Sequence, residues 1–196
     1  LDAADALLVR TMPPGSLEQI VFRMDLLQRL QTAGVLVVNP PRAVETAVDK
    51  YLSLARMEAA GVPVPPTIVC QRPVEAMEAF SLLGGDVILK PLFGSEGFGI
   101  CRLTDEALAE RAFHLLARAG SALYLQKHIR HDGSDLRLMV IGDRVVAAMR
   151  RRSGQLRTNI ARGGVGERVD PDEAKRDLAL RAAQACGAQV AGVDIV

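Results

Sequence analysis

The chain has 196 residues, of which 49% are hydrophobic and 24% charged, and 24 basic against 23 acidic side chains leave a formal charge of +1. These values are typical of a globular protein with a buried core, and the charge balance does not favour nucleic acid or an anionic membrane as a partner. No apolar run approaches the roughly 20 residues of a membrane span, and no signal peptide is visible. Three isolated cysteines are typical of a reducing, cytoplasmic setting rather than of a zinc cluster.

The first sixty residues carry two kinds of apolar pattern. Short apolar runs at 4–10 and 34–41 predict buried strands, and the helical spacing of apolar residues over 16–34 predicts a helix between them. This β-α-β pattern indicates a parallel sheet, interpreted as the end of a Rossmann-like domain over residues 1–42. Residues 43–61 then predict a single helix with Lys50 in its middle, followed by an extended, proline-rich linker.

Strands and helices alternate through the rest of the chain. The expected strands are 67–70, 86–90, 99–103, 122–129 and 189–196, with an antiparallel hairpin over 135–150 that turns at Gly142 and Asp143. The expected helices are 74–85, 104–120 with Thr104 as N-cap, and 170–187 with Asp170 as N-cap and Glu173 completing a capping box. This succession predicts an α+β architecture after the N-terminal α/β segment.

The stretch "ILKPLFGSEGFGI", residues 88–100, places Lys90 at the end of an apolar strand and before a glycine-rich loop. Such a loop exposes backbone N–H groups that can bind phosphate oxygens. The spacing fits neither a P-loop, in which the lysine follows the glycines, nor a dinucleotide-binding fingerprint. Two plainer interpretations stay open, namely a strand-end lysine that reaches solvent and a simple glycine-rich turn.

Three further groups of charged residues are candidates for chemistry. Asp135 and Arg137 share one face of a strand, either as a surface pair or as the rim of a charged cleft. Residues 150–152 form an arginine run, interpreted as a solvated strand end. Asp194 lies within the apolar stretch "VAGVDIV", where a carboxylate needs a partner, a metal ion or an exposed strand end.

Taken in order, seven motifs resemble one family. They are Asp49-Lys50 leading into "AGVPVPPT", then "ILKPLFGSEGFGI", "LYLQKHI", "SDLRLMVIGDRVVAAMRR", "LRTNIARGG" and "VAGVDIV". Their succession over roughly residues 35–196 resembles the ATP-grasp superfamily and, within it, the RimK-like α-L-glutamate ligases. The resemblance implies two α+β lobes that clamp ATP, with residues 43–129 as first lobe and hinge and 130–196 as part of the second lobe. This would make 43–196 an ATP-grasp domain that is incomplete at its C-terminus.

The resemblance also implies roles for single residues. The positions that match ATP contacts are Lys50, Lys90, Gly94, Ser95, Glu96, Gly97, Gln126, Lys127, His128, Ile129, Asp135, Arg157, Thr158 and Asn159. Arg157 would also stabilise the transferred charge, Asp194 would bind Mg²⁺ (or Mn²⁺), and Arg10 and Arg137 are candidates for substrate carboxylates. Two departures matter: Lys127 stands where the family often has glutamate, and a Glu-x-Asn pair that completes the metal site would follow residue 196.

The reaction implied is ATP-dependent amide formation between an acceptor carboxylate and an amino acid, here L-glutamate, through an acyl-phosphate. The acceptor could be a small molecule, a cofactor or a protein, and homo-oligomerisation is left open. Two alternatives also stay open: another ATP-grasp ligase such as a glutathione-synthetase-like enzyme, and a nucleotide-binding module without ligase activity.

Overall fold

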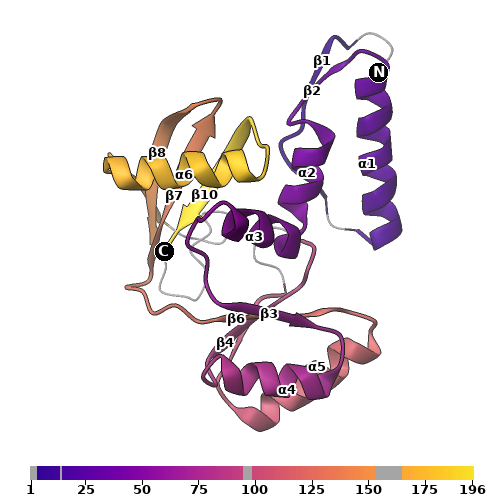
Figure 1. Cartoon of the computed structure of the whole chain (residues 1–196), viewed down its shortest axis with the longest axis vertical. Helices are drawn as coiled ribbons and strands as arrows, with labels where there is room; N and C mark the ends of the chain where they lie inside the picture. Colours follow the sequence, from indigo (N-terminus) through magenta and orange to yellow (C-terminus); the bar gives the residue numbers. More distant parts are fainter. Residues whose placement is uncertain (1–3, 14, 95–98, 153–164) are drawn as a thin grey trace. The chain divides into compact units, whose positions relative to one another are not determined.

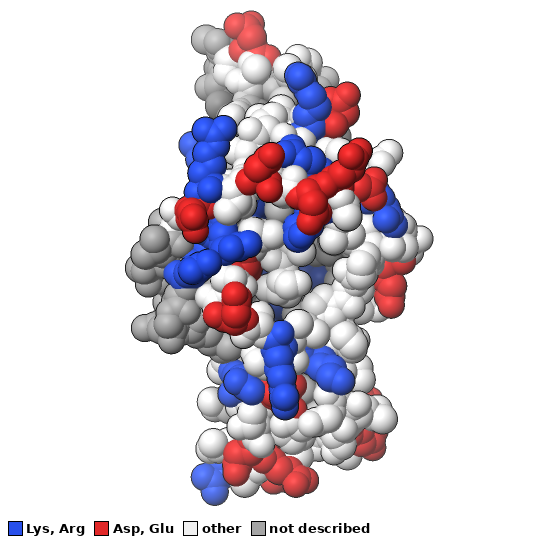
Figure 2. Space-filling model, turned by 90° about the vertical axis from the view of Figure 1, so that its left-hand side faces the viewer, with Lys and Arg blue, Asp and Glu red and all other residues white. Residues whose placement is uncertain are grey.

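The computed structural model describes residues 4–13, 15–94, 99–152 and 165–196. These residues divide into two compact units, one made of Leu1–Val62 with His131–Val196 (unit 1) and the other of Pro63–Arg130 (unit 2). Within the described residues, no helix is long and apolar enough to cross a membrane. Figure 2 shows basic and acidic side chains interspersed on the face turned to the viewer, as the near-zero net charge leads one to expect.

The predicted β-α-β segment is present at the start of unit 1 (Figure 1). Strands β1 (Ala6–Leu8) and β2 (Leu36–Val38) pair in parallel, with α1 (Leu17–Thr32) between them in sequence. Helix α1 begins after Ser16, whose hydroxyl accepts a hydrogen bond from the amide of Gln19 in a capping box. The expectation that both strands are buried was wrong for Ala6 and Leu8 in β1 and for Leu36 in β2, which are exposed.

The single helix expected over 43–61 is divided into two, α2 (Pro41–Val48) and α3 (Lys50–Ala59). Asp49 causes the division, because its backbone is extended and its carboxylate accepts hydrogen bonds from the amides of Tyr51 and Leu52. An aspartate that caps a helix satisfies amides that otherwise have no partner. Lys50 is therefore the first residue of α3 and not, as predicted, a residue in the middle of a helix.

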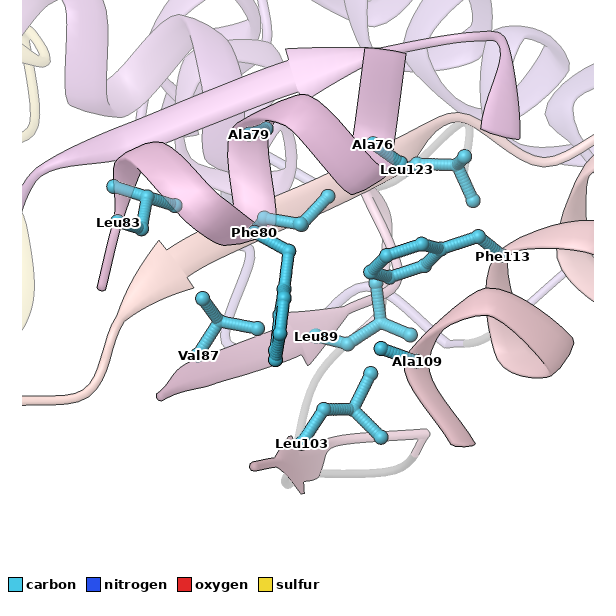
Figure 3. Close-up of a cluster of buried hydrophobic side chains, with 11 residues drawn as sticks. Ala76, Ala79, Phe80, Leu83, Val87, Leu89, Leu103, Ala109, Phe113 and Leu123 are labelled. Atoms are coloured by element: carbon cyan, nitrogen blue, oxygen red, sulfur yellow. The ribbon is translucent and has the colours of Figure 1, made fainter. Parts of the chain in front are cut away.

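Unit 2 is a four-stranded sheet with two helices on one face. Its strands are β3 (Thr67–Cys70), β4 (Val87–Lys90), β5 (Cys101–Leu103) and β6 (Leu123–Lys127), antiparallel in the order β3-β6-β4-β5. Helices α4 (Pro73–Leu82) and α5 (Glu106–Arg118) enclose Phe80 and Phe113 against the strands (Figure 3). Asp105, and not Thr104 as predicted, caps α5 by accepting from the amide of Leu108.

The second part of unit 1 is also a four-stranded sheet, with one helix on one face. The antiparallel sheet has the order β10-β7-β8-β9, formed by β7 (Ser134–Ile141), β8 (Arg144–Arg152), β9 (Val165–Arg168) and β10 (Val190–Ile195). The predicted turn joins β7 to β8, and Gly142 takes a φ of 60° there. Helix α6 (Glu173–Ala185) covers one face through alanines packed on Leu138 and Val140 (Figure 1).

Asp172 is the N-cap residue of helix α6 and accepts a hydrogen bond from the amide of Lys175, so the predicted cap at Asp170 was wrong. Asp170 instead pairs with the guanidinium of Arg176. Farther along α6, the Nη2 atom of Arg181 donates to the carbonyls of Ala60 and Gly61, at 3.2 and 2.8 Å. Carbonyls at the C-terminal end of a helix lack intrahelical donors. Arg181 supplies donors to two carbonyls just after α3 and thereby joins α3 to α6.

Asn39 links the beginning and the end of unit 1. Its Oδ1 atom accepts hydrogen bonds from the amides of Gln189 and Val190, both at 2.7 Å. Its Nδ2 atom donates to the carbonyl of Val190 at 2.7 Å. The side chain thus pairs with the edge of β10 as a neighbouring strand does, and it fixes the segment after β2 on the second sheet. The lobe limits expected from the sequence, 43–129 and 130–196, stay a prediction.

Candidate functional site

In unit 2, two of the polar residues predicted to contact a nucleotide, Lys90 and Gln126, lie on the sheet face opposite α4 and α5. Alternation along the strands places Val87 and Leu89 in the core with Leu125, so Lys90 and Gln126 belong to the other face. The Nζ atom of Lys90 donates to Oε1 of Gln126 at 2.6 Å, and Nε2 of Gln126 donates to Oγ1 of Thr67 at 2.9 Å. Three strands therefore hold one chain of hydrogen bonds that ends at a cationic group.

The glycine loop after Lys90 is described at its two ends. Gly94 has a φ of 122° and Gly99 a φ of 70°, both in the region that side chains rarely adopt. A Cβ atom at Gly99 would lie 3.3 Å from Cγ of Pro91, so the loop also returns close to its own start. Ser95, Glu96 and Gly97, for which phosphate contacts were predicted, lie outside the described residues, and their roles stay predictions.

The predicted hinge, Gln126 to Ile129, uses some of its backbone within unit 2. The amide of Lys127 donates to the carbonyl of Pro66 at 2.8 Å, and the amide of His128 donates to the carbonyl of Asp86 at 3.0 Å. A contact from this segment to a base would therefore come from carbonyl groups or from Ile129. The Lys127 side chain is exposed, and its role stays a prediction.

Sequence reasoning missed a charged group beside this hinge. Two bonds of 2.7 Å join the guanidinium of Arg102 to the carboxylate of Asp86, which also lies 3.4 Å from Nδ1 of His128. The hydrogen bond from Arg102 is the main cause that lowers the pKa of Asp86 below its ordinary value. The group joins the strand ends of β4, β5 and β6, which no local sequence pattern brings together.

Unit 1 carries a network of four charged side chains on the sheet face opposite α6. Arg151 donates from Nε to Asp135 at 2.8 Å and pairs through Nη2 with both Asp135 and Asp194, the latter at 2.9 Å. Arg137 binds Asp194 with bonds of 2.7 and 3.0 Å. Asp135 and Arg151 are only 8% and 3% exposed.

The interpretation of Arg151 as part of a solvated strand end was wrong, because its guanidinium is buried between two carboxylates. Burial by itself lowers the pKa of Arg151, but the hydrogen bond to Asp135 and the charges of Asp194 and Asp135 raise it overall. This arginine therefore stays charged. The requirement that Asp194 have a partner is met by two arginines.

Lys50 is half-buried at the start of α3. Burial lowers the pKa of its ammonium group, and the neighbouring charge of Asp49 opposes this shift. A partly desolvated cation is suited to an anionic ligand, since the ligand's charge favours the protonated form. Lys50 belongs to unit 1 and Lys90 to unit 2, so the prediction that both ammonium groups enter one cleft stays a prediction.

Arg10 and Arg137, predicted to bind substrate carboxylates, line one cavity of about 480 Å³ within unit 1. Arg157, Thr158 and Asn159 lie outside the described residues, so the predicted γ-phosphate segment stays a prediction. Among the described residues, no group of three or more His, Cys, Asp or Glu side chains could hold a metal ion, and both Asp194 oxygens accept from arginines. These residues alone do not form a Mg²⁺ site.

Solved structures with the same fold define the class of protein. A RimK domain ATP-grasp protein from Sphaerobacter thermophilus superposes with a TM-score of 0.78 at 25% identity, covering 98% of this chain and 68% of that chain. The ATP-grasp ligase PsnB, in complex with a minimal precursor, Mg and ADP, has a TM-score of 0.65 at 26% identity, covering 91% of this chain and 54% of that one. The fold is therefore ATP-grasp, as the sequence predicted.

The sequence comparisons narrow this class to one family. The family model for the RimK-like ATP-grasp domain matches residues 47–196, and the chain belongs to this family. A tetrahydromethanopterin:α-L-glutamate ligase from Methanosarcina acetivorans is 34% identical over 100% of this chain. The chain spans 64% of the length of that relative.

Proposed function

We propose that this chain belongs to an ATP-dependent ligase that joins an acceptor carboxylate to the amine of an amino acid, with L-glutamate as the amino acid. The observation that carries the proposal is the hydrogen-bond chain from Lys90 through Gln126 to Thr67, next to a glycine loop, in a member of this family. The α-L-glutamate ligase name of the relative from Methanosarcina acetivorans supports the choice of glutamate.

In this proposal, ATP lies on the sheet face of unit 2 that carries Lys90. Gln126 holds the ammonium group of Lys90 by a 2.6 Å hydrogen bond, which orients the cation before the nucleotide binds. Transfer of a phosphoryl group depends mainly on such positioning and on stabilisation of charge. The loop amides between Gly94 and Gly99 would cover the β- and γ-phosphates, and Arg157 would stabilise the transferred charge.

The acceptor carboxylate would attack the γ-phosphate and displace ADP. The amine would then attack the acyl carbon of the resulting acyl-phosphate, lose a proton and displace inorganic phosphate. Magnesium supplies charge neutralisation to the phosphates in phosphoryl-transfer enzymes. Asp194 is the residue of this chain proposed to bind Mg²⁺ or Mn²⁺. Arg137 and Arg151 orient its carboxylate in the structure.

The proposal is tested by nucleotide binding and phosphate release with the full-length protein. Lys90→Met should weaken Mg·ATP binding by about 1.5–3 kcal/mol, the contribution of a hydrogen bond to a charged group. Calorimetry measures this loss, and Lys90→Arg should recover part of it. Lys175→Met is the matched control, because Lys175 is a surface lysine of α6 that pairs with Asp172.

Phosphate release from ATP should then depend on both an amino acid and an acceptor acid, and the labelled amino acid should appear in an amide product. Wild-type ATP affinity in Lys90→Met would contradict the nucleotide site. ATP binding without any acid-dependent phosphate release across a panel of acceptors would identify a binding module instead of a ligase. Release that depends on an amino acid other than glutamate would retain the ligase and exclude a glutamate ligase.

A further inference from the structure

The hydrogen-bond chain on the Lys90 face of the unit 2 sheet continues beyond Thr67 into the proline-rich segment before β3. Thr67 is the direct cross-strand partner of Gln126, which places both side chains on the same face. The Oγ1 atom of Thr67 accepts a hydrogen bond from Nε2 of Gln126 at 2.9 Å and donates one to the carbonyl of Pro65 at 2.8 Å. The chain therefore runs from a backbone carbonyl to the ammonium group of Lys90.

The chemistry of these groups allows one orientation of the Gln126 amide. A carbonyl can only accept, so the Thr67 hydroxyl gives its single hydrogen to Pro65 and offers a lone pair to Gln126. The atom of Gln126 that faces Thr67 must then be the donor Nε2, which leaves the acceptor Oε1 to face Lys90. The reversed amide would place its NH₂ group against an ammonium group, and both of these are donors. Both ends of the chain thus require the same orientation.

The carbonyl at the start of the chain is held by the linker sequence "VPVPPT", residues 62–67. Pro65 precedes Pro66, and a residue before a proline is restricted to extended backbone, which limits the direction of its carbonyl. The carbonyl of Pro66 accepts from the amide of Lys127 at 2.8 Å, so the linker is also attached to β6. The proline pair therefore gives the Thr67 hydroxyl a fixed acceptor.

We propose that Thr67 is a positioning residue of the nucleotide site: its hydroxyl fixes the amide of Gln126 and, through it, the ammonium group of Lys90. This inference rests on the proposed function for the role of Lys90. It gives Thr67 an effect on nucleotide affinity that requires no contact with the nucleotide. The effect is partial, because the hydroxyl of Tyr124, 3.4 Å from Nε2 of Gln126, still offers a longer and weaker bond when Oγ1 of Thr67 is removed.

Calorimetry of Mg·ATP binding to the full-length protein tests the effect on affinity. Thr67→Val retains a branched side chain and removes the hydroxyl, so it should weaken binding about fivefold, the effect of one neutral hydrogen bond. Thr67→Ser restores the hydroxyl and should bind as the wild type does. Thr32→Val is the matched control, because the Thr32 hydroxyl also donates to a carbonyl, that of Gln28 on α1 of unit 1.

A double-mutant cycle separates positioning from general damage to the sheet. In a Lys90→Met background the Gln126 amide has no ammonium group to orient, so adding Thr67→Val should change ATP affinity by less than about twofold. Thermal melts verify that the variants are folded, and Thr67→Ala takes the place of Thr67→Val if the latter does not fold.

A spectroscopic measurement tests the chain without nucleotide. Ammonium hydrogens held by hydrogen bonds exchange slowly with water, so Lys90 should give a ¹H–¹⁵N ammonium signal in the wild type, identified by its absence in Lys90→Met. The signal should be lost in Thr67→Val and retained in Thr67→Ser and Thr32→Val.

The proposal is overturned if Thr67→Val binds Mg·ATP as Thr32→Val does, if Thr67→Ser fails to restore binding, or if the losses of Thr67→Val and Lys90→Met add in the double variant. These results leave the proposed function in place as long as Lys90→Met itself weakens binding. Wild-type affinity in Lys90→Met, or no ATP binding at all, would instead remove the nucleotide site. The ammonium signal then decides alone: its loss in Thr67→Val retains the positioning of Lys90 by Thr67, and an unchanged signal overturns it.

Discussion

Arg151 shows how much depends on one buried side chain. Arg151 is 3% exposed, and its guanidinium pairs with two carboxylates, Asp135 on β7 and Asp194 on β10. Replacing buried ion pairs with apolar residues is often neutral, whereas removing one partner leaves an uncompensated charge. The network is therefore sensitive to single substitutions and more tolerant of paired ones.

We expect Arg151→Met to reduce the free energy of unfolding by about 3–5 kcal/mol, because Asp135 would remain buried without its cation. Denaturation by urea, followed by circular dichroism, measures the loss. The double variant Asp135→Leu with Arg151→Met should recover most of it, since no buried charge is left. If the double variant is as unstable as the single one, the loss does not come from the unpaired charge of Asp135.

Asp194→Asn should abolish ATP turnover in the full-length protein while weakening nucleotide binding by no more than about tenfold, if its carboxylate binds Mg²⁺ as proposed. Phosphate release and calorimetry measure the two quantities separately. The variant Asp143→Asn is the control, because it makes the same change in an exposed aspartate at the turn between β7 and β8. Turnover at the wild-type rate in Asp194→Asn would exclude the metal role.

The sequence indicated that Asp194 needs a partner, but it did not indicate which one. The partner depends on strand register, and β7 and β8 change register between Met139 and Val140. Counting back from the pair of Ile141 and Arg144 without this irregularity would place Arg150 opposite Asp135, whereas the structure places Arg151 there. A β-bulge in the middle of a hairpin leaves no clear local signal, and so the buried arginine was missed.

At the scale of elements, most helices and strands followed from apolar spacing. Strand β9 (Val165–Arg168) was missed, and the other errors concern where helices begin. Asp105 and Asp172 cap their helices one or two residues after the predicted caps, Thr104 and Asp170. Asp49 caps a helix inside a stretch that was predicted to be helical throughout. All of these side chains can accept hydrogen bonds from backbone amides, so local sequence leaves the choice open. In the structure, Asp49 is the N-cap residue of α3, so Lys50 lies at the N-terminus of that helix.

The group of Asp86, Arg102 and His128 gives unit 2 a pH-dependent element. Since the pKa of Asp86 is lowered in the folded state, its stabilising effect is complete above the ordinary aspartate pKa of about 3.9 and is lost as pH falls through the folded value. Arg102→Met should therefore lower stability slightly at neutral pH and by less in acid, as expected for a partly exposed pair.

Urea denaturation at neutral pH and at about pH 3 tests this expectation. Arg111→Met, on the exposed surface of α5, serves as the control for loss of an arginine in the same unit. An equal loss of stability in Arg102→Met at both pH values would show that Asp86 does not contribute through its charge.

On the scale of the whole molecule, each unit has hydrophobic clusters of its own, one in unit 2 and two in unit 1. Phe113 is fully buried in the core of unit 2, and Leu138 is fully buried in a core of unit 1. We expect Phe113→Leu to cost about 1–2 kcal/mol and to accelerate hydrogen exchange mainly within residues 63–130. Leu138→Val should cost about 1 kcal/mol and act mainly on the other unit. Equal acceleration across both units, in either variant, would mean that they unfold as one.

The side chain of Asn39 also has a consequence for the order of folding during synthesis. Its hydrogen-bond partners are 150 and 151 positions later in the chain, so they leave the ribosome long after Asn39 itself. Unit 2 is continuous, from Pro63 to Arg130, and all its strands are available before β10 is made. Because domains generally fold as units during synthesis, unit 2 can complete its sheet before the hydrogen-bond partners of Asn39, Gln189 and Val190, are synthesised. The hydrogen bonds between Asn39 and β10 then form last, and a nascent chain stalled before residue 189 would carry a finished unit 2 together with an unfinished unit 1.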